Sequence, residues 1–518
     1  MSHFPVIIIG GGPVGLSMAL LLAQQKIHCL LVEKHPHTTN HPKARGVNGR
    51  SMEIFRQLGL ESHLEKYKLP AEATRFIWLE DFQGQEVTRV EDNTDYAKQS
   101  PTTRAVIAQD NVEDELYNKA VNSEYIDLHF NMKMTSAEQN SERVLITVVN
   151  QASNETTQVT GDYLIGADGA YSSLRDIFGV NMQGADNLGE FCNIYCEMNL
   201  DRYIAHRPSV GFMFTREDIL GTFILAKAGF QKWLVGVRLR DEAGFSKDMF
   251  TDDYCVQFVK DVVRDDSVDV KLINKGFWTM AALIADQYRV GRVFLAGDAA
   301  HRLPPTGGFG MNTGIQDAHN LAWKLAFVLN GYANDSLLNT YESERLPIAY
   351  TNIMWSNKNA ERFNKIYSSL IEEDYQSFKN ALADQTNHLN NINLDLGFIY
   401  GQDYANHSDF QQTSVVGGRA PHCWLKSHDK TYSTLDLFVD KYILLCAKES
   451  EHWHSVLKNK PFPYQILVIG KEGDYEDINQ DFSQLYDIGN DGAVLVRPDG
   501  HIAWIGKNQQ AEFDYHLD

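Results

Sequence analysis

The sequence has few cysteines, and their spacing excludes most of the chemistry that cysteine supports. Among 518 residues only Cys192 and Cys196 lie close together. No second pair and no histidine spacing completes a zinc site, and no C-x-x-C motif offers a redox pair. We therefore expect buried free thiols and no metal site. The six cysteines are Cys29, Cys192, Cys196, Cys255, Cys423 and Cys446.

Long apolar runs are also missing. The apolar stretch Val6–Ile9 is too short, and too close to Met1, for the apolar core of a signal peptide, so it is interpreted as a strand. Basic residues are in the minority, with 47 Lys and Arg against 68 Asp and Glu and a net charge of −21. This charge repels nucleic acid and anionic membranes. We expect a cytoplasmic protein with neither as a partner.

The N-terminal segment carries a dinucleotide-binding pattern. A β-branched strand precedes three glycines, Gly10, Gly12 and Gly15, and an apolar helix follows them. Glycines at this spacing allow a tight turn, close approach of a pyrophosphate and close packing of helix on strand. The next strand ends at Glu33, the expected partner of a ribose hydroxyl. Lys34, the following residue, is also a candidate cofactor-binding residue. The acid disfavours NADP, while NAD and FAD both remain open on this segment.

The stretch from Arg292 to Asn312 combines a strand end, a glycine-rich loop and a helix start. Val293–Ala296 is interpreted as a short buried strand, and Asp298 follows it. Glycines that include Gly308 let the backbone approach a ligand closely. Apolar residues recur at helical spacing from about Phe309, so a helix should begin there.

A carboxylate at a strand end, followed by bare amides at a helix N-terminus, suits a ligand with hydroxyls and a developing negative charge. An isoalloxazine on a ribityl chain is such a ligand. Asp298 would accept a ribityl hydroxyl, and the amides near Met311 and Asn312 would face the flavin N1–C2=O edge. A strand-to-helix turn of an ordinary α/β domain is the plainer alternative.

The motif G-D-A-A-H…P-P-T-G-G-F-G-M-N resembles the second flavin motif of the single-component flavoprotein aromatic hydroxylases. That family includes para-hydroxybenzoate hydroxylase, phenol hydroxylase and the aromatic polyketide hydroxylases. The N-terminal glycine pattern and the segment D-Y-L-I-G-A-D-G match its other motifs in the same order, and the resemblance covers nearly the whole chain.

The resemblance implies further cofactor residues. An arginine at the place of Arg45 lies beside the flavin in the family, and Gln109 stands where the family has a polar contact to the ribityl or phosphate region. Asp168 belongs to the motif associated with FAD and the reducing nucleotide, although it could be mainly structural. Pro305 would lie near the reacting centre.

A length of 518 residues is too great for one core, so we expect an α/β protein of several domains. Residues 1–70, 101–185 and 286–370 would form a Rossmann-like FAD-binding domain, and residues 71–100 and 186–285 an interleaved antiparallel-sheet domain for the substrate. A linker would span residues 371–416. Residues 417–518 resemble the thioredoxin-like tail of phenol and polyketide hydroxylases, without C-x-x-C, which favours a scaffold or a homodimer contact.

Aromatic side chains on the predicted antiparallel strands could line a flat apolar pocket for an aromatic guest. Phe212, Phe214 and Phe223 are the candidates, although such residues are more often plain core. No acid or base residue is assigned.

The resemblance implies an FAD-dependent monooxygenase that consumes NADH or NADPH and O2. It would hydroxylate a phenolic or polyketide-type aromatic substrate through a flavin C4a-hydroperoxide. Two alternatives stay open: a Baeyer–Villiger or epoxidising FAD monooxygenase acting on a polyketide, and an FAD dehydrogenase or oxidase without oxygen transfer.

Overall fold

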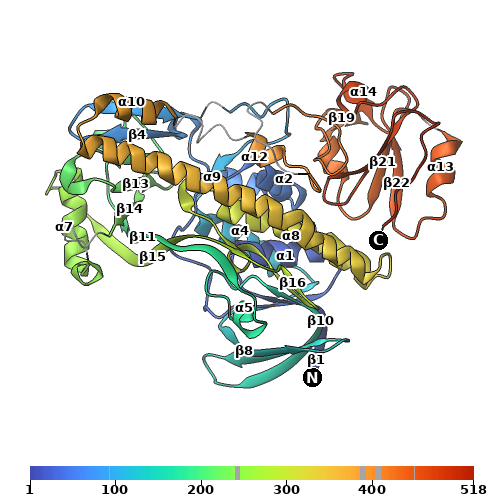
Figure 1. Cartoon of the computed structure of the whole chain (residues 1–518), viewed down its shortest axis with the longest axis horizontal. Helices are drawn as coiled ribbons and strands as arrows, with labels where there is room; N and C mark the ends of the chain where they lie inside the picture. Colours follow the sequence, from blue (N-terminus) through green and yellow to red (C-terminus); the bar gives the residue numbers. More distant parts are fainter. Residues whose placement is uncertain (93, 240–245, 385–391, 403–409, 449, 518) are drawn as a thin grey trace.

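The chain is organised around two eight-stranded sheets and a C-terminal unit, residues 410–517, that contains two smaller sheets (Figure 1). The second eight-stranded sheet and the C-terminal unit lie at opposite ends of the molecule, as Figure 1 shows. The computed structural model describes residues 1–92, 94–239, 246–384, 392–402, 410–448 and 450–517.

The glycine-rich turn follows the central strand of the first sheet. β1 (Ser2–Ile9) pairs in parallel with β2 (Cys29–Val32) on one side and with β10 (Thr156–Gly166) on the other. β17 (Val293–Leu295) continues the parallel set beyond β10, and β7 (Ile126–His129) beyond β2. β2 and β17 are short and wholly buried, as expected of strands covered on both faces.

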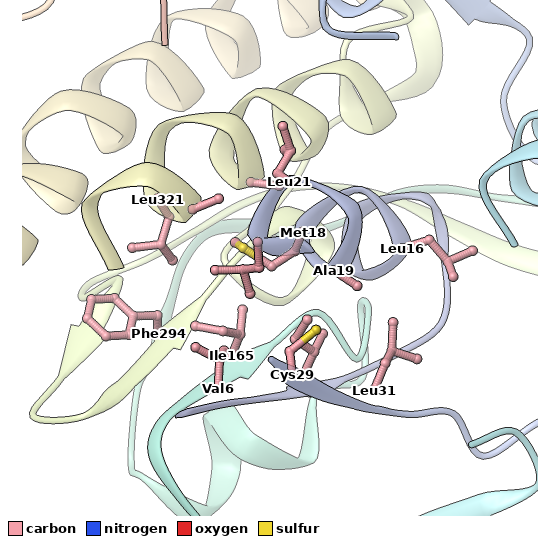
Figure 2. Packing of buried hydrophobic residues seen from close by; sticks show 14 of the residues in the cluster. Val6, Leu16, Met18, Ala19, Leu21, Cys29, Leu31, Ile165, Phe294 and Leu321 are labelled. Carbon is pink, nitrogen blue, oxygen red and sulfur yellow. The ribbon is translucent and has the colours of Figure 1, made fainter. Parts of the chain in front are cut away.

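One face of this sheet is covered by α1 (Pro13–Gln24) and α8 (Gly310–Leu329). Residues 15–22 of α1 are all buried, which is typical of a helix that is apolar on every side. Figure 2 shows the packing of α1 between the sheet and α8. Its labelled residues are Val6, Leu16, Met18, Ala19, Leu21, Cys29, Leu31, Ile165, Phe294 and Leu321. The predicted buried strand and the helix start near Phe309 are confirmed.

The second sheet is assembled from distant segments. Its long central strands, β11 (Met182–Glu197) and β15 (Lys271–Ala285), pair antiparallel with each other. Two strands from early in the chain, β4 (Arg75–Leu79) and β5 (Glu86–Glu91), join its far edge, as expected for residues 71–100. The remaining strands are β12 (Gly211–Phe214), β13 (Phe223–Ala226), β14 (Lys232–Arg238) and β18 (His301–Arg302).

Two further helices pack against the second sheet. α7 (Asp252–Val263) packs on one face of the second sheet, and its buried residues join the cluster formed by that face. α9 (Asn339–Ile371) contacts both α8 and β15 and crosses the molecule in Figure 1. Pro347 lies inside α9.

The segment predicted as a linker is packed where the structure describes it. α10 (Tyr375–Asp384) lies against α9, and residues 385–391 and 403–409 lie outside the described residues. Asp395, in the short helix α12 (Ile392–Leu396), is 3% exposed and accepts a hydrogen bond from the Tyr96 hydroxyl at 2.6 Å. The domain boundaries themselves stay a proposal.

The C-terminal unit contains a four-stranded sheet and the short helix α13. β21 (Tyr442–Cys446) pairs in parallel with β22 (Tyr464–Val468) and antiparallel with β24 (Ala493–Val496). β25 (Ile502–Gly506) forms a hairpin with β24, and α13 (Glu451–Leu457) lies between β21 and β22 in the sequence.

A buried ion cluster joins this unit to α2 (Gly49–Gln57). Glu53 of α2 accepts hydrogen bonds from Arg419 at 2.5 and 2.9 Å and from Arg50 at 2.8 Å. The side chains of all three residues are at most 5% exposed. Although burial disfavours the charge, Arg419 and Arg50 hold the pKa of Glu53 at about 2.

We predict that Glu53→Gln destabilises the protein by about 3–5 kcal/mol, because it leaves two buried arginines without their counter-charge. The carboxylate stabilises the fold above its unfolded pKa, about 4.3, and this contribution is lost as pH falls towards the folded pKa. Thermal unfolding between pH 7 and pH 3 measures both effects. Glu61→Gln is the control, because the Arg56–Glu61 pair is about one-quarter exposed and worth at most about 1 kcal/mol. Equal shifts for the two variants would contradict the prediction.

Candidate active site

The carboxyl ends of four parallel strands meet at one edge of the first sheet. Ile9 is paired with Val32 and with Gly166, and Gly166 is paired with Leu295, so these ends lie in one row. The predicted site residues Gly10, Glu33, Asp168 and Asp298 follow these strand ends within three residues. The structure therefore brings together motifs that are far apart in the sequence, at the edge where α/β sheets bind ligands.

The three glycines of the first motif differ in what they make room for. A Cβ on Gly10 would lie 2.1 Å from the Ala167 carbonyl oxygen, and one on Gly15 would lie 1.9 Å from the Gly10 carbonyl oxygen. Gly10 also has a φ of +114°, which favours glycine. A Cβ on Gly12 would meet nothing within 4 Å. Two glycines thus serve chain packing, and the third leaves open space for a pyrophosphate.

Glu33 lies directly beside this turn. Its Oε2 accepts a hydrogen bond from the Gly11 N–H at 2.6 Å, and its Oε1 accepts one from the His35 N–H at 2.8 Å. This is the location expected of a ribose partner. Lys34 is exposed, and its carbonyl oxygen accepts a hydrogen bond from the Gln151 side chain.

Asp298 follows β17 and lies in a short 3-10 turn. Its side chain is solvent-exposed, yet the surrounding protein desolvates the carboxyl and raises its pKa. Both observations fit a recessed position that solvent reaches from one side. Within the described part of the chain the carboxylate accepts no hydrogen bond, so it is free to accept one from a ligand hydroxyl.

The loop before α8 leaves backbone amides available. Pro305 and Gly308 are exposed, and Gly308 has a φ of +66°. Phe309 stands at the N-cap of α8 and caps it with no side-chain hydrogen bond. The first-turn amides, including that of Met311, therefore keep the partial positive charge of a helix N-terminus. The Asn312 side chain is fully engaged, since it bonds the Asn48 N–H and the carbonyls of Gly46 and Gly308 at 2.7–3.0 Å.

Arg45 is a buried cation with too few hydrogen-bond partners. The residue is 9% exposed and donates one hydrogen bond, to the Ala226 carbonyl oxygen, while its Nε and Nη2 are buried without a partner in the described structure. Burial lowers the pKa of its guanidinium to about 10. A buried cation with two unused donors is costly unless an anionic or carbonyl-bearing ligand meets it.

Gln109 and Asp168 have structural partners. Asp168 Oδ2 accepts from the Ser173 N–H at 2.8 Å and the Leu174 N–H at 3.3 Å, which leaves Oδ1 buried and unpartnered in the described residues. Gln109 begins α4 (Gln109–Ala120) and donates to Glu113 at 2.7 Å. Asp168 therefore holds the start of the following helix through Oδ2, as the structural interpretation expects. Its Oδ1 can still accept a hydrogen bond from a ligand.

Two of the three aromatic candidates are corrected by the structure. Phe212 and Phe214 are 0% exposed and belong to the cluster between the second sheet and α7, so they are core residues. Phe223 projects to the opposite face, because it pairs with Met213, while Ile224 pairs with Phe212. Alternation along the strands predicts two faces but does not say which of them α7 covers.

Two family models cover almost the whole chain. The model described as FAD binding domain matches residues 3–356, and the one described as aromatic-ring hydroxylase, C-terminal, matches residues 413–517. The chain belongs to the flavoprotein aromatic hydroxylase family. The resemblance drawn from the sequence is thereby confirmed, and this aromatic hydroxylase is an FAD-dependent monooxygenase.

Relatives of this aromatic hydroxylase match it over more than nine-tenths of their length. Tetracenomycin A2 monooxygenase-dioxygenase of Streptomyces glaucescens is 32% identical over 97% of this chain and 93% of its own. The 4-methyl-5-nitrocatechol 5-monooxygenase of a Burkholderia species is 31% identical over 96% and 93%. The flavin-dependent monooxygenase PieE, solved with FAD and substrate, superposes with a TM-score of 0.91 at 28% identity, covering 98% of this chain and 96% of its own.

The residues at the sheet edge fit FAD. Open space at Gly12 suits a pyrophosphate, the uncapped start of α8 and the unused donors of Arg45 suit an electron-rich ring edge, and Asp298 suits a ribityl hydroxyl. Bound FAD supplies the oxygen-activating chemistry that protein side chains lack.

Two further features of the aromatic hydroxylase concern membrane-spanning helices and potential metal ligands. None of the helices in the described ranges combines the length and the apolar character needed to span a membrane. In the C-terminal unit, Cys423, Asp477 and Asp481 bring potential metal-ligand atoms within 4.8 Å of one another, a grouping that sequence spacing did not indicate.

We predict that Asp298→Ala weakens FAD binding about 5- to 150-fold, because a ribityl hydroxyl loses its acceptor at a cost of about 1–3 kcal/mol. FAD titration of the apoprotein measures the change. Asp298→Asn keeps an oxygen acceptor and should retain most of the affinity. Wild-type affinity in the alanine variant would remove Asp298 from the site.

We predict opposite effects of Arg45→Met on the two forms of the protein. The FAD-free form should melt at the same or a higher temperature, because two unpartnered buried nitrogens are removed, while FAD affinity falls. Arg207→Met is the matched control: Arg207 is 6% exposed, but it donates to the Tyr203 and Phe82 carbonyls at 3.0 and 2.7 Å. That variant should lose thermal stability and keep its FAD affinity. A destabilised FAD-free Arg45→Met protein would contradict the prediction.

Proposed function

We propose that the protein uses NADH or NADPH and O2 to hydroxylate a phenolic ring, with FAD held at the edge of the first sheet. The observation that carries the proposal is the constellation at that edge: the open glycine turn, the uncapped α8 and the unpartnered Arg45. Relatives named for nitrocatechol, dichlorophenol and tetracenomycin substrates support a phenolic substrate class.

The proposed cofactor contacts are assigned to three regions of FAD. Gly10, Gly12, Gly15, Glu33 and Lys34 serve the dinucleotide half, and Asp168 and Asp298 serve the region of the linking hydroxyls. Arg45, Gln109, Pro305, Gly308, Met311 and Asn312 surround the ring and its ribityl chain. For Asn312 the contact would be the backbone amide, because its side chain already has three partners.

The protein itself would position the reacting groups and exclude water from them. The loop of residues 304–310 is fixed to α9, since the Thr306 hydroxyl donates to the Ser356 carbonyl at 2.7 Å and Asn359 donates to the Thr306 carbonyl at 3.3 Å. A loop fixed in this way keeps the reacting region dry and its geometry constant. The helix N-terminus at Met311 would stabilise negative charge at the ring edge.

The alternatives differ in what happens to oxygen. Baeyer–Villiger or epoxidising chemistry also inserts one oxygen atom but gives a lactone or an epoxide, whereas a dehydrogenase or oxidase inserts none. The route of oxygen transfer, a cytoplasmic location and a homodimer stay predictions.

The deciding experiment screens phenols with the FAD-loaded enzyme under ¹⁸O2, with NADH and NADPH in parallel. A suitable panel contains 2,4-dichlorophenol, 4-nitrocatechol and 1-naphthol. We expect at least one phenol to accelerate NAD(P)H oxidation and to gain one labelled ring hydroxyl, as mass spectrometry would show. Oxidation without label would support the dehydrogenase or oxidase, and C–C cleavage with label the Baeyer–Villiger reaction.

A further inference from the structure

The side-chain amide of Asn193 is buried and incompletely satisfied. The residue is 7% exposed, and within the described structure its Oδ1 is fully buried with no hydrogen-bond partner. An acceptor left in this state costs about 1–3 kcal/mol unless a ligand supplies a donor. The unpartnered oxygen therefore indicates that a ligand donates a hydrogen bond to Asn193.

Asn193 lies on the second sheet between two residues that have no side chain. Its neighbours on β11, Cys192 and Ile194, are 0% exposed and point to the α7 face, so Asn193 points to the other face. The residues paired with it on both sides are glycines, Gly236 on β14 and Gly276 on β15. Neither flanking position contributes a side chain, which leaves room above the amide.

That room is limited by aromatic rings. Phe223 covers Gly236, because a Cβ there would lie 2.0 Å from its ring, whereas a Cβ on Gly276 would meet only His41, at 4.0 Å. Phe191 and Trp278, paired across β11 and β15, stack with their ring centroids 4.6 Å apart. The Trp278 indole N–H is buried and has no partner among the described residues.

The same face is turned towards the proposed flavin site. Arg45 donates to the carbonyl of Ala226 on β13, and His41 is bonded to Asn274 on β15 at 2.6 Å. The His41 ring also meets Tyr195, the next residue of β11 on this face, with centroids 5.9 Å apart. The segment that carries Arg45 thus lies over the row of the sheet that contains Asn193.

We propose that Asn193 binds the hydroxyl of the phenolic substrate and selects free phenols over arenes that lack it. A phenolic hydroxyl donates to an amide oxygen and can accept from an indole N–H, so its chemistry matches that of both unpartnered atoms. Phe223 and the Phe191–Trp278 pair form the apolar wall for the ring. This inference rests on the proposed function and specifies how that site recognises its substrate.

The test measures binding to the FAD-loaded enzyme without NAD(P)H, from the change in flavin absorbance. Two matched pairs of probes differ only by the hydroxyl: 1-naphthol and naphthalene, and 2,4-dichlorophenol and 1,3-dichlorobenzene. We expect the wild type to bind at least one phenol about 5- to 100-fold more tightly than its matched arene. Asn193→Leu, which keeps the volume and removes the acceptor, should abolish the difference, and Asn193→Asp should restore it.

Asn187→Leu, at an exposed position of the same strand, is the control and should behave as wild type. Discrimination that survives in Asn193→Leu overturns the inference, and so does a wild type that prefers neither phenol. Because binding is measured without turnover, this outcome is separate from the labelled-oxygen result: an enzyme can hydroxylate phenols and still ignore Asn193.

Discussion

The site depends on one buried carboxylate that belongs to no recognised motif. Asp317 of α8 accepts hydrogen bonds from His301 at 2.6 Å, from Arg345 of α9 at 2.8 Å and from the Gly297 N–H at 3.1 Å. The side chains of Asp317, His301 and Arg345 are 0% exposed. Burial opposes ionisation, but His301 and Arg345 hold the pKa of Asp317 below its usual value. Breaking such a cluster by removing one member costs several kcal/mol.

This carboxylate fixes the geometry around Asp298. Gly297 has a φ of +61°, and its N–H is held by Asp317, so the chain turns at that point and Asp298 leaves the sheet edge. Arg345 also donates to the Thr313 carbonyl at 3.2 Å, in the first turns of α8. The acid proposed for the ribityl chain and the helix end proposed for the ring are therefore held by one network.

The sequence predicted the fold and the site unevenly, for physical reasons. Motifs with a local cause, such as the glycine turn after β1, the strand end before Asp298 and the start of α8, were predicted closely, because neighbouring residues determine them. The Asp317 network was missed because its partners are separated by 16 to 28 residues and meet only after α8 packs on the sheet. Phe212 was misassigned because alternation along a strand defines two faces without saying which one α7 covers. Asn193 could have been noticed as a polar residue in an apolar strand, but its glycine neighbours belong to other strands.

The C-terminal unit is bound to the rest of the protein more closely than the predicted domain boundary at residue 417 suggests. Arg419 holds Glu53 in α2, and α2 is capped by Asn48, whose backbone N–H donates to Asn312 at the start of α8. One short helix thus connects the tail to the edge where the prosthetic group would lie. A chimaera that carries the C-terminal unit of a relative would also need that relative's α2. Removing the C-terminal unit would expose α2, the helix that adjoins the proposed FAD site.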